Sequence, residues 1–296
     1  QYDITFGGHG RQGYSPAISN WLTSNYKPYA DKALTANGHI PGQLLFAVND
    51  RDFSEGNVLL LGEPRFSDAY GDLRHMASVL VENHSLKPFR QRVLGTYVLL
   101  ESTMKLLATE GQSLKESTIT DRVKRAVTVP MKWKVPQMNT AVSFELQANL
   151  LQKDKSASAA DSMHLLGIES RIVKSPITNA DYTEWTGKPV TMKIANYKGT
   201  EPLEFVTRPK AYYIPASCYE IIERLKMHGI KMEILKQPRE VTLEMFRIQD
   251  AKFQNAEGKP APFEGHIQVT GTSYAEIRKE LFAAGSAYVS TDQPLG

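Results

Sequence analysis

The segment SVLVENHSLKPFRQRV, residues 78–93, contains the transition on which the fold assignment rests. Its apolar run 79–81 is typical of a buried strand, and Glu82 follows directly. After Pro88, apolar residues recur in steps of four and three, which is the spacing of one helix face. These residues are Val93, Tyr97, Leu100, Met104 and Leu107. The segment therefore predicts a strand and then an amphipathic helix, which we expect to end at Gly111.

The same alternation of strand and helix extends over the first 115 residues. Ser15 followed by Pro16 is typical of a helix start, because serine caps the first turn and proline fits the first helical position. Apolar residues at helical spacing follow, so we expect a helix over 16–35. The apolar run 44–48 predicts another buried strand. Residues 1–115 therefore predict an α/β layer, a mixed sheet with flanking helices.

From 116 to 205 the apolar residues change to a period of two, which is typical of strands. The alternation predicts strands at 127–133, 142–150 and 190–194, with a polar loop at 152–162. This stretch is therefore expected to be a separate β-rich module.

Residues 206–296 contain signals for helices again. Two capping boxes of the form S-x-x-E begin at Ser217 and Ser273. Each predicts a helix that ends at a downstream glycine, Gly229 or Gly285. Alternating apolar residues between the two boxes predict short strands, so we expect a small α+β domain.

Composition and charge exclude several functional classes. The chain has 296 residues with 35 basic and 32 acidic side chains, and this balance gives no general reason to expect nucleic-acid binding. The basic residues of 122–134 alternate with apolar ones, as on the solvated face of a strand. The longest apolar runs are far shorter than the roughly 18 residues of a membrane span. Cys218 is the single cysteine, so a disulfide framework or thiolate zinc cluster cannot form within one chain, and we expect a structural role for it.

Two motif searches favour neither a nucleotide nor a metal site. Residues 8–13, GHGRQG, match G-x-G-x-x-G, but in nucleotide-binding proteins the helix begins within the glycines. Here Ser15 and Pro16 start the helix after the last glycine, which favours a glycine-rich turn. None of the seven histidines lies in an H-x-x-E or H-E-x-x-H pattern, so no metal ligand is assigned within this chain.

Glu82 is the candidate catalytic residue. Ligands of open α/β sheets bind beyond the carboxyl ends of strands, so an ionisable side chain there is placed for general-base chemistry. His84 lies two residues further on and shares a face with Glu82 if the strand continues. The alternative is a structural carboxylate paired with Arg90 or Arg92. Position alone leaves both interpretations open.

Residues 78–93 resemble the zinc carboxypeptidase family in its large bacterial members, in which a strand delivers the catalytic glutamate and a helix follows. The upstream sequences PRFS (64–67) and Tyr70-Gly71 resemble the segment that leads to that strand. The sequences YYIP, ERLK, HGI and FEGH, at 212–215, 223–226, 228–230 and 263–266, resemble the C-terminal extension of the same proteins. The resemblance covers about 1–115 and 205–296, and 116–205 matches weakly.

The resemblance implies a hydrolase that cleaves the C-terminal bond of a peptide substrate. In this family zinc polarises the carbonyl and activates water, and the glutamate matched by Glu82 is the general base. Tyr70 would match a substrate-binding tyrosine. The zinc ligands, an H-x-x-E pair and a later histidine, do not occur in this chain, and we expect them upstream of Gln1. The chain would then be the second half of a peptidase domain with its C-terminal modules, inactive by itself.

The resemblance also suggests a secreted or periplasmic location. The alternative function is a non-catalytic protein that binds peptide or cell-wall glycan through the β-rich middle and the last domain. The sequence does not indicate side-chain specificity or oligomeric state.

Overall fold

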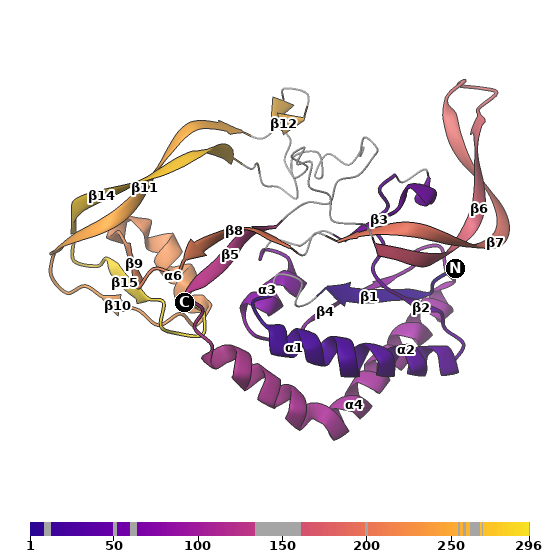
Figure 1. Cartoon of the computed structure of the whole chain (residues 1–296), viewed down its shortest axis with the longest axis horizontal. Helices are drawn as coiled ribbons and strands as arrows, with labels where there is room; N and C mark the ends of the chain where they lie inside the picture. The colour runs from indigo at the N-terminus through magenta and orange to yellow at the C-terminus, as the bar shows by residue number, and fades with distance from the viewer. Residues whose placement is uncertain are drawn as a thin grey trace. The chain divides into compact units, whose positions relative to one another are not determined.

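A computed structural model of the chain describes residues 1–8, 13–49, 52–59, 64–133, 161–198, 201–253, 255–256, 259–260, 267 and 269–295 (Figure 1). Their helices and small sheets form a mixed α/β architecture, which confirms the general fold class predicted from the sequence.

Within the described ranges the chain divides into two compact units. Unit 1 contains 1–124, 130–133 and 161–206, and unit 2 contains 125–129 and 207–295. Most of the described residues of the expected β-rich module, 116–205, belong to unit 1. The boundary expected near 205 lies beside the division between 206 and 207.

Unit 1 contains a three-stranded sheet with the order β2–β1–β4. The central strand β1 (Ile4–Gly8) pairs antiparallel with β4 (Val79–Asn83) and parallel with the two-residue β2 (Pro41–Gly42). The strand predicted at 79–81 is thus confirmed. It lies at the edge of the sheet, and its apolar side chains are half-buried rather than buried.

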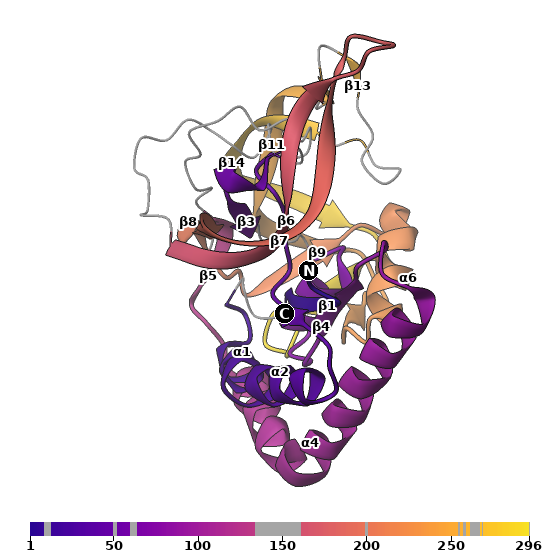
Figure 2. The same cartoon turned by 90° about the vertical axis from the view of Figure 1, so that its right-hand side faces the viewer.

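Helices pack together on one side of this sheet (Figures 1 and 2). α1 (Pro16–Trp21), a π-helical turn (Leu22–Tyr26) and α2 (Lys27–Ala36) follow one another without a break, which confirms the helix predicted over 16–35. They pack against α4 (Phe89–Val123). The buried core of this layer comprises Ile4, Phe6, Trp21, Tyr26, Ala30, Leu34, Val98, Leu99 and Leu106.

α4 is longer than the sequence predicts. It runs for 35 residues, and Gly111, the expected end, lies inside it. Leu114 packs against the core beyond this glycine, so burial of the second half of the helix outweighs the local stop signal. Ser and Thr side chains along α4 donate to carbonyls three or four residues earlier, an arrangement that bends helices. The α4 ribbon is bent in both views (Figures 1 and 2).

The apolar face that we predicted for α4 is not the face that packs on the core. Its five residues are exposed, and the roughly opposite face is buried instead. That face includes Gly95 and Ser102, whose small size allows close approach; a Cβ added at Gly95 would lie 3.4 Å from Nδ1 of His39. Helix α4 therefore carries one apolar face in the core and another in solvent.

The strand predicted at 44–48 does not form. Among these residues only Ala47 forms a β-bridge, an isolated one to Asn57. The amide of Phe46 donates to the side-chain oxygen of Asn57 at 2.7 Å, so a side chain satisfies a group that a strand partner would bind. The two ends of the run are buried, and its backbone pairing is limited to this one bridge, so no strand forms.

A long hairpin completes unit 1. β6 (Asp161–Lys174) and β7 (Asp181–Lys198) pair antiparallel, and β3 (Asn57–Leu59), after a 3-10 turn (Phe53–Glu55), adds parallel to β7. This confirms the strand predicted at 190–194. The end of the hairpin extends away from the rest of unit 1 (Figure 1).

β5 (Thr128–Trp133) and β8 (Pro202–Thr207) form a further two-stranded sheet, which confirms the strand predicted at 127–133. The strand predicted at 142–150 and most of the loop at 152–162 lie outside the described residues.

Unit 2 contains a small sheet with the order β10–β15–β9 and the helix α6. The strands are Glu233–Ile234 (β10), Ala287–Ser290 (β15) and Ala211–Ile214 (β9). Helix α6 (Tyr219–Met227) follows a 3-10 turn (Ala216–Cys218) and ends two residues before Gly229. The helix predicted after Ser217 is therefore confirmed, although its N-cap is Cys218 and no side chain caps it.

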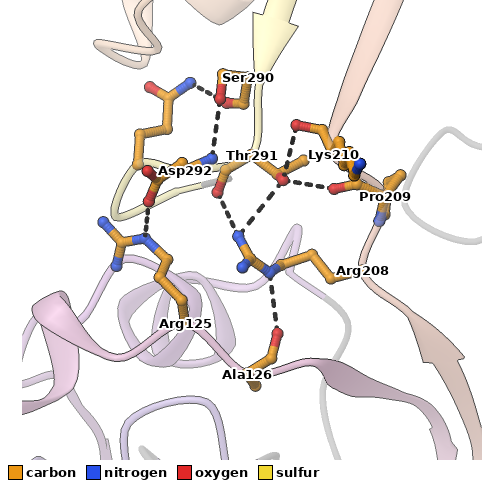
Figure 3. Close-up of polar contacts among 9 residues, drawn as sticks. Arg125, Ala126, Arg208, Pro209, Lys210, Ser290, Thr291 and Asp292 are labelled. Carbon is orange, nitrogen blue, oxygen red and sulfur yellow. Dashed lines mark hydrogen bonds and ion pairs between the residues drawn. The ribbon is translucent and has the colours of Figure 1, made fainter.

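A polar cluster joins three segments of unit 2 (Figure 3). Arg208 donates from Nε to the carbonyl of Ala126 at 2.9 Å and from Nη1 to the carbonyl of Thr291 at 2.7 Å. Arg125 forms an ion pair with Asp292 at 3.3 Å. Because the Arg208 guanidinium binds carbonyl groups of two segments that are far apart in sequence, it holds the end of β15 to residues 125–129, the first segment of unit 2.

The prediction of a helix after Ser273 is wrong. This segment lies in β14 (Val269–Phe282), which pairs antiparallel with β11 (Arg239–Phe253) in a two-stranded ribbon. The acidic member of the expected capping box, Glu276, instead accepts a 2.8 Å hydrogen bond from Arg247 across the ribbon. Cross-strand pairing thus outweighs the local capping signal. Two short strands, Asn255–Ala256 (β12) and Lys259–Pro260 (β13), also pair.

Candidate functional site

Glu82 lies inside β4, at the edge of the three-stranded sheet. It is aligned with Thr5 of β1, and the amide of His84 donates to the carbonyl of Asp3 at 3.2 Å, so the pairing continues past the end of β4. The Glu82 side chain is exposed. The described residues show no ion pair between Glu82 and either Arg90 or Arg92, the partners of the structural interpretation. The carboxylate is therefore held on a paired backbone and open to solvent.

The turn after β4 fixes the backbone of His84. Its carbonyl accepts a hydrogen bond from the amide of Lys87 at 3.0 Å, and its Nδ1 accepts one from the amide of Leu86 at 3.3 Å. Partial burial lowers the pKa of His84, and the positive charges of the Gln1 amine and of Lys87 lower it further. A neutral ring that accepts at Nδ1 carries its proton on Nε2.

A buried carboxylate, Asp3, holds this turn against the sheet. Its side chain is 3% exposed and accepts hydrogen bonds from the amide of Ile40 at 2.9 Å and from Nε2 of Gln91 at 2.7 Å. Nζ of Lys87 lies 2.9 Å from it, and Nδ1 of His39 lies 4.0 Å away. The network therefore ties β1 to the start of α4, on both sides of the turn that follows Glu82.

Asp3 is ionised in this network. Burial alone would raise its pKa, but the hydrogen bonds from the Ile40 amide and from Lys87, together with the charge of Lys87, outweigh that effect and lower it. Sequence reasoning missed Asp3; the available signal is an acidic residue within the strand-like sequence YDITF at 2–6.

Tyr70, the expected substrate-binding residue, lies in α3 (Ser67–Leu73) and is half-buried, with the guanidinium of Arg74 over its ring at 5.6 Å. This helix contacts the start of β4, because Oγ of Ser78 donates to the carbonyl of Asp68 at 3.0 Å. Glu82 is four residues beyond Ser78, which corresponds to about 13 Å at the spacing of residues in a strand. The structure thus places the two predicted residues toward opposite ends of one strand.

The N-terminus of α1 is occupied by a side chain from the same unit. Asp121, 1% exposed, accepts hydrogen bonds from the amides of Ala17 and Ile18 at 3.1 and 2.9 Å. Residue Ser15 is the N-cap, as predicted, but its hydroxyl donates to the carbonyl of Asp72 instead. These amides are the groups that would bind a pyrophosphate. Residues 9–12 of the glycine motif lie outside the described residues, but the helix after it already binds an internal anion.

The remaining sequence candidates contribute no further site. Cys218 is half-buried at the start of α6. Among the described residues, no group of three or more His, Cys, Asp or Glu side chains could hold a metal ion. The part of the chain that the structure describes therefore offers no zinc site. It also contains no helix long and apolar enough to cross a membrane.

Comparisons of the sequence with protein-family models, with curated proteins and with solved structures found no match.

Proposed function

We propose that this chain is part of a peptidase of the zinc carboxypeptidase type and that Glu82 supplies the general base. The observation that supports the proposal is an exposed carboxylate on a paired edge strand, followed by a fixed turn and a long helix. This is the order of strand, glutamate and helix on which the resemblance rests.

Glu82 would act by accepting a proton from the attacking water and passing it to the leaving amine. Two features suit it to that step: its carboxylate is open to solvent, and its backbone is held by β1 on one side and by the Asp3 network beyond it. Zinc would supply the polarisation of the scissile carbonyl. Because the described residues do not form a zinc site, the ligands of the metal would lie outside them.

The test measures release of the C-terminal residue from a blocked dipeptide by the complete protein. We expect Glu82→Gln to lower kcat by about 10²–10⁴-fold with little change in KM, because the substitution removes the base and keeps the shape. Glu101→Gln, which changes an exposed acid on α4, is the matched control and should leave kcat unchanged. A Glu82→Gln enzyme with normal kcat would falsify the assignment, and so would a tight 1:1 zinc complex of the present chain.

A second function, recognition of peptide or cell-wall glycan, is favoured by the ribbon of β11 and β14. Phe246, Ile248, Ile277 and Leu281 share one exposed apolar face of it. If this is the functional surface, a Phe246→Ser variant should lose binding to insoluble cell wall or to a peptide resin, and Glu82→Gln should bind normally. Equal binding by both variants and the unmodified protein would exclude the ribbon as the binding surface.

A further inference from the structure

The C-terminus of helix α2 places an asparagine before a glycine on the surface of unit 1. Asn37 is the C-cap residue of the helix, and both Asn37 and Gly38 are exposed. The fold requires the glycine, because its φ of 79° is left-handed and closes the end of the helix. A Cβ added at Gly38 would meet no atom within 4 Å, so neither the residue nor its surroundings obstruct its backbone nitrogen.

An unobstructed nitrogen after asparagine can attack the side chain of that asparagine. The Gly38 nitrogen forms a bond to Cγ of Asn37, the bond from Cγ to Nδ2 breaks, and the amide proton leaves with Nδ2 as ammonia. Water then opens the resulting succinimide ring at either carbonyl. One product is aspartate. The other is isoaspartate, in which the main chain runs through Cγ and is one atom longer.

Hydrogen bonds hold the pair in an unreactive arrangement while the end of the helix is intact. The amide of Gly38 donates to the carbonyl of Thr35 at 3.1 Å, and the amide of His39 donates to a carbonyl of the last turn at 3.0 Å, the two bonds of a Schellman cap. Nδ2 of Asn37 donates to the carbonyl of Ala33 at 2.9 Å. Because the attacking nitrogen must lose its proton, the bond to Thr35 has to open first. Terminal turns open at a lower free energy than a core does, so the cap slows the reaction without preventing it.

The residues after Gly38 connect this site to the buried network around Asp3. His39 is 8% exposed, and its Nδ1 lies 4.0 Å from the Asp3 carboxylate. The amide of Ile40 donates to the same carboxylate at 2.9 Å. An extra main-chain atom before His39 displaces both groups, and the new carboxylate lies at the negative end of the α2 dipole. Isoaspartate should therefore weaken the network that holds the turn after Glu82.

We propose that Asn37 is a site of spontaneous deamidation, that the C-terminal cap of α2 controls its rate, and that the isoaspartate product destabilises unit 1. The reaction needs only water, and the proposal does not depend on the peptidase function.

Peptide mapping by mass spectrometry, after incubation of the present chain in mildly alkaline buffer, tests the site. Trypsin releases residues 33–51 as one peptide. We expect it to gain the mass difference between NH₂ and OH, and fragment ions to place the change at Asn37. Electron-transfer fragmentation then distinguishes isoaspartate from aspartate.

Asn179 is the matched control within the same chain. It lies in the exposed turn of the β6–β7 hairpin and is followed by Ala180, whose Cβ obstructs the nitrogen. Asn37 should react several-fold faster than Asn179. An Asn37 that stays unmodified overturns the proposal, and so does an Asn37 that reacts no faster than Asn179.

Unfolding the chain in guanidinium chloride tests the role of the cap. Because the bond from Gly38 to Thr35 is then absent, the rate at Asn37 should rise several-fold over the rate in the folded chain. A rate that unfolding leaves unchanged would contradict control by the cap.

Thermal unfolding of fresh and incubated chains tests the consequence. Incubated chain, separated from unreacted chain by ion exchange, should unfold at a temperature several degrees lower. Asn37→Asp adds the charge without the extra atom and should lower the midpoint less, and incubated Asn37→Gln should keep its midpoint. Equal midpoints for fresh and deamidated chain would contradict the link to the Asp3 network, and so would an equal loss in incubated Asn37→Gln.

Discussion

The α/β core of unit 1 and the two long hairpins, β6–β7 and β11–β14, use acidic side chains in opposite ways. In the α/β core of unit 1, Asp3 and Asp121 are almost fully buried, and backbone amides donate hydrogen bonds to both. On the hairpins the acids form ion pairs that solvent reaches: Lys174 with Asp181 on β6 and β7, where both side chains are exposed, and Arg247 with the half-buried Glu276 on β11 and β14. The hydrogen bonds are of similar length, so length does not distinguish the two groups.

The two groups of acids differ in whether water can take the place of a lost hydrogen-bond or ion-pair partner. A buried amide that loses its acceptor stays unsatisfied, which costs about 1–3 kcal/mol for each group. An exposed charge that loses its partner is hydrated and screened, so its loss costs little. The α/β core of unit 1 should therefore depend on individual carboxylates far more than the hairpins do.

The largest effect is expected at Asp121. Asp121→Ala leaves the amides of Ala17 and Ile18 without an acceptor at the start of α1, and we expect a loss of about 3 kcal/mol in the free energy of unfolding. Asp121→Asn keeps one acceptor oxygen and should lose about 1 kcal/mol. Urea unfolding followed by far-UV circular dichroism measures both values.

The control for this prediction is Glu116→Ala, one and a half turns earlier on α4. Glu116 is exposed, and the one hydrogen bond that its carboxylate accepts among the described residues comes from Gln112, so the loss should be below about 0.5 kcal/mol. Equal effects of Asp121→Ala and Glu116→Ala would show that burial does not separate the two classes of acid.

The next largest effect is expected at Asp3 and depends on pH. Asp3→Asn removes the charge that Lys87 pairs with, and we expect a loss of about 2 kcal/mol at pH 7. The folded-state pKa of Asp3 lies below its ordinary value of about 3.9, so its contribution is complete above that value and is lost as pH falls through the folded pKa. The difference between the two proteins should therefore shrink below about pH 4. A difference that stays constant from pH 7 to pH 2 would contradict an ionised Asp3.

Local sequence signals predicted the elements that are specified by residues close together in the sequence. The helix start at Ser15 and Pro16 and the strand at 79–81 are where the pattern indicates. The two capping boxes show the limit of such signals. Ser217 lies just before α6, but Ser273 lies inside β14, because pairing with the distant β11 decides the structure there. Gly111 fails as a helix stop for the same reason, since Leu114 beyond it is held by the core.

Part of the candidate site could be predicted from the sequence. The position of Glu82 on a strand before a helix follows from the apolar run and Pro88, but its place at the sheet edge depends on which strand pairs with β1. Asp3 and Asp121 could not be recognised as structural acids, because their partners lie between about 37 and 104 residues away in sequence. The exposed face of α4 has the same spacing as a core face, and only the fold distinguishes them.

The smallest effect is expected for the ion pair of Lys174 and Asp181, 2.7 Å apart near the end of the β6–β7 hairpin. Their side chains are 64% and 49% exposed, so solvent screens the attraction and each charge is well hydrated alone. A double-mutant cycle with Lys174→Met and Asp181→Asn should give a coupling energy below about 0.5 kcal/mol at low salt, and this should disappear in 0.5 M NaCl. The unfolding measurement used for Asp121 applies unchanged. A coupling above about 2 kcal/mol would place this exposed pair with the buried acids of the α/β core, and accessibility would then not explain the difference between the core and the hairpins.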